Sequence, residues 1–230
     1  MFKLIDLEIK KFKLLNYWKG VFIANLGFIA FLCMIYILEK NDGVIPFEDF
    51  EMAAKIISST VRATFTIFAS VIIVKLVIDE FKNKSIDIMF TYPISRKKIM
   101  TAKLIIVVAF TFINVLLSTL FIEGLFYLAD ELFNILPGKI RIDEIYRNIL
   151  ITFVNSLATA GMSLIPLLFG MIKKSASTTI ISSIFIVALT STTSSNFTLF
   201  SIIAIPISLG LIGLLIGYLS IRNIEKQDLV

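Results

Sequence analysis

Six long apolar stretches constrain this chain more than any other feature of its sequence. They cover approximately residues 20–38, 57–78, 102–128, 149–172, 176–193 and 197–221. A helix needs roughly 20 mostly apolar residues to cross about 30 Å of hydrocarbon. Apolar residues make up 57% of the 230 residues and charged residues only 17%, against roughly 45–50% and 25% in soluble domains. The sequence therefore predicts an all-α membrane protein with six transmembrane helices in a single domain, residues 1–230.

The fifth stretch is the weakest of the six because it is short and rich in Ser and Thr. A count of four or five spans therefore stays open as an alternative. The polar patch at 190–196, which follows this stretch, forms either a short re-entrant turn before the last span or an ordinary polar loop.

Basic residues are unevenly distributed among the segments that join these stretches. With six spans, fifteen Lys and Arg residues lie on the side of both termini and five on the opposite side, together with nine acidic residues. Cytoplasmic loops carry an excess of Lys and Arg, so both termini are predicted to face the cytoplasm. The net charge of +5 and the pI near 9.2 then reflect topology. We expect the lipid bilayer of the cell membrane as a partner, and no nucleic acid.

The N-terminal segment, residues 1–19, is predicted to form an amphipathic helix in the headgroup region. Apolar residues that include Phe2, Ile5, Ile9, Phe12 and Leu15 interleave with the basic residues Lys3, Lys10, Lys11, Lys13 and Lys19. Their alternation is typical of an interfacial helix. A compatible alternative is a basic flank that anchors the first span, with Tyr17 and Trp18 in the aromatic belt.

Two charged residues lie inside predicted spans, where charge is costly and often functional. Arg62 lies about five residues into the second stretch and Glu123 about five residues before the end of the third, so both sit at a similar depth near the outer side. They are expected to form an ion pair or to flank a substrate route, unless each extends separately to the interface. Lys75, near the inner end of the second stretch, is expected to reach the cytoplasmic headgroups.

The segment 79–103, DEFKNKSIDIMFTYPISRKKIMTAK, joins the second and third spans on the predicted cytoplasmic side. Ile86, Met89 and Phe90 can share one helical face while charged residues occupy the others. Pro93 restricts the residue before it to extended geometry and ends that helix. Ser95 is placed to cap a new helix that runs into the third span.

This segment resembles the corresponding loop of the ABC-2 type exporter permeases. The matching residues are Glu80, Phe81, Lys84, Ser85, Ile86, Asp87, Met89, Pro93, Ile94, Ser95, Arg96 and Lys103. The hydropathy pattern agrees with that family over nearly the whole chain. Lys84 departs from the family, which often has Gly at this place, and this puts the turn geometry in doubt.

The resemblance implies that residues 80–91 form a coupling helix that docks on a separate ATP-binding subunit. The residues implicated in ATPase coupling are Glu80, Phe81, Ser85, Ile86, Asp87, Met89, Phe90, Pro93 and Arg96. An apolar stripe flanked by charges can dock while remaining soluble at the membrane surface. The alternative is an ordinary basic loop that only enforces orientation.

Several kinds of chemistry have no candidate residues in this chain. It contains no His, its single Cys33 lies in an apolar run, and it has no GxxxxGKS/T phosphate-binding loop. We therefore expect no catalytic, metal-binding or cofactor-binding residues, and no enzyme activity in this chain. The resemblance places ATP and Mg in the partner, with two ATP-binding subunits and a second permease copy in a homodimer or a heterodimer.

The function that the resemblance implies is export across the cytoplasmic membrane, driven by ATP hydrolysis in the partner. A small permease with short external loops resembles those that expel amphipathic or antimicrobial peptides and confer antibiotic resistance. The alternatives are an ion-coupled secondary transporter, which would usually show internal repeats or several intramembrane acidic residues, and a membrane sensor or assembly factor that transports nothing.

Overall fold

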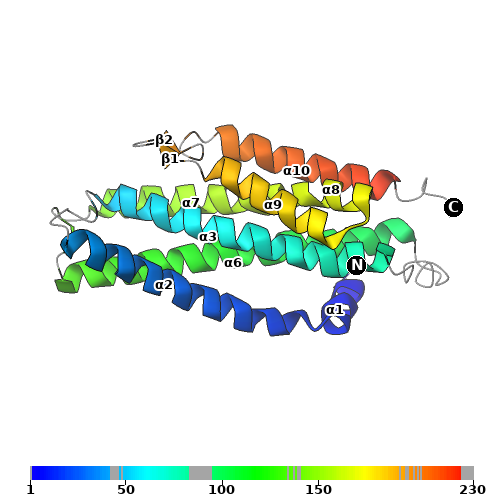
Figure 1. The fold of residues 1–230 in the computed structure, drawn as a ribbon, viewed down its shortest axis with the longest axis horizontal. Helices are drawn as coiled ribbons and strands as arrows, with labels where there is room; N and C mark the ends of the chain where they lie inside the picture. The colour runs from blue at the N-terminus through cyan, green and yellow to red at the C-terminus, as the bar shows by residue number, and fades with distance from the viewer. Residues whose placement is uncertain are drawn as a thin grey trace.

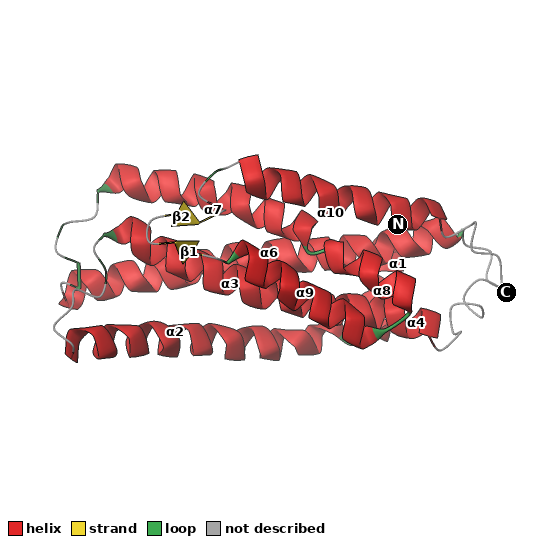
Figure 2. Cartoon of the chain, turned by 45° about the horizontal axis from the view of Figure 1, so that its top comes forward, coloured by secondary structure: helices red, strands yellow, loops and turns green. Residues whose placement is uncertain are grey.

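The computed structural model describes residues 2–41, 47, 49–82, 95–133, 135, 136, 138, 141–191, 193, 194, 197, 198, 200, 202 and 204–223. The described chain is a bundle of long helices with one small two-stranded ribbon (Figures 1 and 2). In chain order its first half comprises α1 (Phe2–Lys11), η1 (Leu14–Asn16), α2 (Tyr17–Asn41), α3 (Phe50–Ile73), η2 (Val74–Ile78) and α4 (Asp79–Lys82). Its second half comprises α6 (Arg96–Phe133), α7 (Ile142–Met162), α8 (Ile165–Lys173), α9 (Ala176–Thr190), β1 (Thr193–Ser194), β2 (Phe197–Thr198) and α10 (Ala204–Asn223).

Within the described residues, five helical stretches are long and apolar enough to cross a membrane. They are Tyr17–Asn41, Phe50–Lys82, Arg96–Phe133, Ile142–Lys173 and Ala204–Arg222. The sixth predicted span corresponds to α9, whose 15 residues reach only about 22 Å at 1.5 Å per residue. The all-helical membrane architecture is confirmed, whereas the weakest predicted span is also shorter than the others.

Several helices begin or end outside the ranges predicted from hydropathy. The second starts at Phe50 rather than near 57, because the Asp49 side chain accepts a hydrogen bond from the Met52 N–H at 2.7 Å and caps it. The third extends the predicted 102–128 in both directions, and its 38 residues span about 57 Å. The fourth breaks between α7 and α8 at Ser163–Leu164, just before Pro166, which cannot donate a helical hydrogen bond.

The N-terminal helix is shorter than the predicted 1–19 segment. Helix α1 ends at Lys11, and Lys13 adopts a positive φ of 49° before η1 leads into α2. Figure 1 shows α1 turned across the direction of α2. Ile5, Ile9 and Phe12 pack against the buried core of the bundle, so the apolar face of α1 rests largely on protein.

Helices α7 and α10 pack closely because glycines remove the side chains between them. A Cβ atom at Gly161 would lie 2.5 Å from the Gly210 carbonyl oxygen, and one at Gly213 would clash with the Gly161 carbonyl oxygen. Any larger residue at these positions would force the two backbones apart. This contact fixes α10 against the last turns of α7.

The two ends of the bundle differ in which helices reach them. We call the end that carries α1 and the last residues of α10 the terminal end, and the opposite end the distal end. Figure 1 shows that α9 and α10 stop short of the distal ends of α3 and α7, and that the β1–β2 ribbon lies beside this step. The distal halves of α3 and α7 are therefore not covered by the last two helices.

Candidate functional site

Four charged residues from three helices meet inside the terminal end. Glu8 and Lys11 come from α1, Glu80 from α4 and Lys103 from α6, and we call these four residues the ionic cluster. Lys103 is 2% exposed. Its ammonium forms a short hydrogen-bonded ion pair with Glu80 and lies 3.5 Å from the Glu8 Oε2. A buried lysine is tolerated only when it is paired in this way.

Glu80 bridges the buried and the exposed cations of the ionic cluster. One carboxylate oxygen faces Lys103, and the other accepts a hydrogen bond from the Lys11 Nζ at 2.7 Å. Glu80 is 6% exposed and Glu8 is 5% exposed. Two carboxylates and two ammonium groups balance one another, so the ionic cluster fixes α1, α4 and α6 together without net charge.

A π-helical segment precedes Glu80. In η2 the Asp79 N–H bonds to the Val74 carbonyl, five residues back, and the Leu76 carbonyl accepts a hydrogen bond from the Lys103 Nζ at 2.6 Å. Such wide turns within α-helices occur frequently at functional sites. Within η2, the Lys75 ammonium lies 5.3 Å from the centre of the Tyr17 ring, so this lysine has a contact within the protein.

The ionic cluster lies where the predicted coupling segment leaves and re-enters the bundle. The stretch Phe50–Lys82 is helical throughout, so residues 80–82 continue the second long helix rather than begin a separate one. Helix α6 begins at Arg96, directly after Ser95, as predicted. The motif residues Ser85, Ile86, Asp87, Met89, Phe90 and Pro93 lie outside the described residues.

The position of Glu80 changes the interpretation of that residue. The sequence placed it among the residues that contact an ATP-binding subunit, but its carboxylate is buried and paired within the chain. Phe81 is partly buried and packs against the core. Both residues thus contact other parts of the chain itself.

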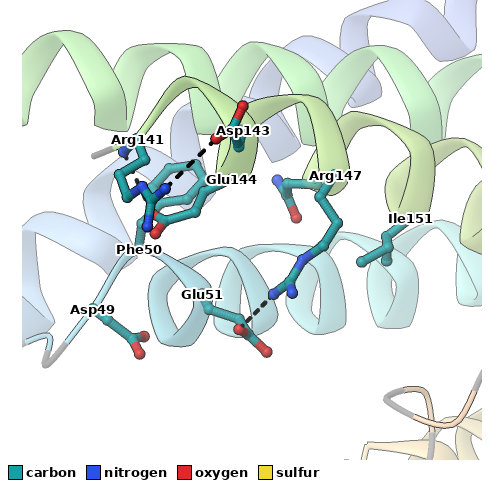
Figure 3. Close-up of a pocket in the computed structure, with 9 residues that line it drawn as sticks. Asp49, Phe50, Glu51, Arg141, Asp143, Glu144, Arg147 and Ile151 are labelled. Carbon is teal, nitrogen blue, oxygen red and sulfur yellow. Dashed lines mark hydrogen bonds and ion pairs between the residues drawn. The ribbon is translucent and has the colours of Figure 1, made fainter.

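At the distal end, the first turns of α3 and α7 enclose a charged cavity of about 340 Å³. Figure 3 shows Glu51 of α3 and Arg147 of α7 directed toward one another across it. Their oxygen and nitrogen atoms lie 2.9 Å apart, and Lys55 lies 2.9 Å from the same carboxylate. All three side chains are at least 38% exposed, so these pairs are solvated.

A second cavity, of about 130 Å³, adjoins the first and reaches Arg62. Glu51, Asn148 and Ile151 line both cavities, and we call the two together the distal groove. Arg62 is 3% exposed, and its guanidinium carbon lies 3.5 Å from the centre of the Phe200 ring. The groove thus leads from an exposed charged opening to a buried cation.

Arg62 and Glu123 do not form the predicted ion pair. Among the described residues, no carboxylate oxygen lies within 4.0 Å of the Arg62 nitrogens, and its Nε has no hydrogen-bond partner. Glu123 is 5% exposed and lies beside the Asn148 side chain, and its Oε1 has no hydrogen-bond partner among the described residues. The pair fails because Arg62 lines the groove between α3 and α7, whereas Glu123 on α6 meets the amide of α7.

A comparison with known protein families matches the part of the chain that holds the ionic cluster and most of the distal groove. The family model described as ABC-2 family transporter protein matches residues 4–189. The chain belongs to the ABC-2 family of transporter proteins. It is 44% identical over 225 residues, covering 98% of this chain and 99% of the relative, to the uncharacterized protein YcbO of Bacillus subtilis (strain 168). No solved structure matches the chain.

Membership identifies the chain as a component of membrane transport and as a multi-pass membrane protein. ABC-2 permeases normally work with an ATP-binding subunit. The match includes the ionic cluster and most of the distal groove. Within the described chain, no group of three or more Cys, Asp or Glu side chains is arranged to hold a metal ion.

Three residues that the structure brings into these sites were not predicted from the sequence. Glu8 is a carboxylate within the apolar stripe of Ile5, Ile9 and Phe12, and this position was a usable signal of a buried partner. Asn148 and Phe200 gave no such signal. Their roles depend on the contacts of α7 with α3 and of the α9–α10 connection with Arg62.

Proposed function

We propose that this ABC-2 protein is the permease subunit of an ATP-driven exporter in the cytoplasmic membrane. A separate subunit binds ATP and Mg and hydrolyses the nucleotide. The observation that carries the proposal is the uninterrupted helical stretch Phe50–Lys82, which runs from the distal groove into the ionic cluster and ends where the family motif continues. A motion imposed on that motif is delivered directly to α3.

We also propose the membrane placement that the loop charges indicate. The terminal end, with its excess of Lys and Arg, faces the cytoplasm. Helix α8 ends at the terminal end, and α10 also runs toward that end. The chain must therefore return to the distal end between them, and α9 serves as this sixth crossing although it is short. The connection after Thr190 then turns back inside the distal end as a re-entrant segment, with Phe200 beside Arg62.

Two groups of motif residues have different roles in the proposed coupling step. The segment 83–94, with Ile86, Met89 and Phe90 on one face, docks on the ATP-binding subunit. Glu80 and Lys103 tie this segment to α1 and α6. When ATP closes the partner subunits, the segment moves with them and the long helices follow, which alternates access to a passage between two permease copies.

The proposed assembly contains two permease copies and two ATP-binding subunits, and an amphipathic peptide is the proposed cargo. Short connections at the distal end support the peptide proposal, since they leave no large external domain to bind a bulky substrate. Such an exporter would confer resistance to membrane-active peptide antibiotics. Growth of cells with and without the protein in a panel of such peptides tests the cargo.

Association with an ATPase is the test of the proposed function. The chain carries an affinity tag after Val230, is extracted in a mild detergent, and is analysed for a co-purifying subunit with ATPase activity. We expect such a subunit with the wild type and its loss in Asp87→Lys, which reverses a charge in the docking segment. Glu80→Lys is a poor probe, because it also breaks the ionic cluster.

Asp143→Lys is the matched control for this experiment. It makes the same charge reversal at an exposed position of α7, at the opposite end of the bundle. Membrane insertion of all three proteins is compared by their yield in the membrane fraction. If no ATPase co-purifies with the wild type, or if Asp87→Lys retains it fully, the coupling proposal is wrong.

A further inference from the structure

Arg62 is a buried cation for which the described chain provides no acidic partner. It lies twelve residues after the start of α3, or about 18 Å along the helix. The Phe200 ring covers one face of its guanidinium, and the Nε atom has no hydrogen-bond partner. A charge at this depth of a membrane protein is costly and marks a functional position when nothing in the chain neutralises it.

The side chain opens into a cavity whose walls are polar. The polar residues that line it together with Arg62 are Ser58, Ser59, Asn148, Thr152 and Asn155. A cavity needs about 10–15 Å³ to hold one water molecule, and this one measures about 130 Å³. It therefore has room for a group of several heavy atoms, with hydroxyl and amide groups to complete its hydrogen bonds.

The charge balance of the cavity favours an anion. Its only lining carboxylate among the described residues is Glu51, which is engaged by Lys55 and by Arg147, each at 2.9 Å. Lys55 also lines the cavity. Arg62 therefore adds a positive charge that no acidic group of the cavity offsets.

We propose that Arg62 and the polar wall of this cavity bind an oxyanion, either a phosphate group or a carboxylate group. A guanidinium presents a planar fork of N–H donors that matches both groups, and such charge-assisted hydrogen bonds are strong where water is excluded. The first cavity of the distal groove supplies the path of entry. The role of this site in recognising cargo rests on the proposed export function, but the binding itself does not.

The test is a titration of the purified full-length chain in dodecyl maltoside micelles, which contain neither phosphate nor carboxylate groups. Thermal unfolding is followed while inorganic phosphate or octanoate is added at constant ionic strength, with octanol as the uncharged control. We expect at least one anion, and not octanol, to raise the unfolding temperature of the wild type. The anion that acts distinguishes a phosphate from a carboxylate ligand.

Three variants test whether the effect belongs to Arg62. In Arg62→Gln the apparent Kd should weaken at least about tenfold, the loss expected when a charge-assisted hydrogen bond is removed. Lys10→Gln removes an exposed, already paired cation at the terminal end and should change the Kd less than about twofold. Phe200→Leu keeps the cation and exposes its second face, so anion binding should persist in it even if Arg62→Gln does not fold.

Two results overturn the proposal. The first is the absence of any anion response in the wild type, as expected if a carboxylate of a second copy of the chain occupies Arg62. The second is an equal response in Arg62→Gln. Either result leaves the proposed function standing if the ATPase still co-purifies, so the two proposals fail separately.

Discussion

The ionic cluster at the terminal end and Arg62 in the distal groove both place charge inside the bundle, but they neutralise it differently. Lys103 has two carboxylates and a backbone carbonyl within reach. Arg62 has an aromatic ring and an open polar cavity. Both side chains are at most 3% exposed, so the contrast is one of partners and not of burial.

This difference separates a structural site from a candidate binding site. A buried ion pair whose opposite charges balance within the chain holds helices in register and leaves no net charge for a ligand. A buried cation without an acidic partner lowers stability, and proteins keep such groups mainly where they act on something else. Substitutions at the two sites should therefore change the free energy of unfolding by different amounts, and even in opposite directions.

The largest effect is expected from Lys103→Met. It leaves Glu8 buried without a cation and Glu80 paired only with the exposed Lys11, and breaking a buried pair in this way costs about 3–5 kcal/mol. The free energy of unfolding is measured in mixed detergent micelles by the fluorescence of Trp18, the single tryptophan of the chain. Lys98→Met, at an exposed position of the same helix, is the control and should change little.

A double variant sharpens this result. Adding Glu80→Gln to Lys103→Met removes the carboxylate that lost its buried cation, so the combined loss should fall short of the sum of the two single losses by about 0.5–3 kcal/mol. Additive losses would mean that the two residues do not interact. A loss in Lys103→Met no larger than in Lys98→Met would refute the structural role of the ionic cluster.

The sequence predicted the helices well and their ends poorly. Long apolar runs located all six helical stretches, since only a helix satisfies the backbone in hydrocarbon. Hydropathy placed the start of the second near 57 because Glu51 and Lys55 count as polar, although they pair with one another on the first turns of α3. The break after Lys11 has no Gly or Pro to signal it.

The candidate sites were predicted as residues but not as contacts. Glu80 and Lys103 both belong to the family motif, yet their pairing over 23 positions depends on how α4 meets α6. Arg62 and Glu123 were identified as buried charges by their place in apolar runs. Their expected pairing was wrong because depth along a helix gives no information about the direction of a side chain.

A smaller effect is expected at the opening of the distal groove. Glu51→Gln removes ion pairs with Arg147 and Lys55 whose side chains are exposed, and exposed pairs contribute about 0.2–1 kcal/mol. The loss should shrink further in 1 M salt, where the screening length falls to about 3 Å. The loss in Lys103→Met should persist in the same salt, because buried pairs are screened less. Equal salt sensitivity at both sites would contradict the contrast between them.

The smallest loss in the free energy of unfolding is expected from Arg62→Met, although Arg62 is nearly as buried as Lys103. The change removes the contact with Phe200, which contributes about 0.5–2 kcal/mol, but it also relieves the burial of a charge that has no acidic partner. These opposing terms should leave the free energy of unfolding within about 0.5 kcal/mol of the wild type or raise it, because an apolar residue of similar volume often replaces a buried charge without penalty. The same unfolding assay measures both variants. A loss of several kcal/mol in Arg62→Met would show that this arginine stabilises the bundle, as Lys103 does, and that the terminal and distal charges differ less than their partners indicate.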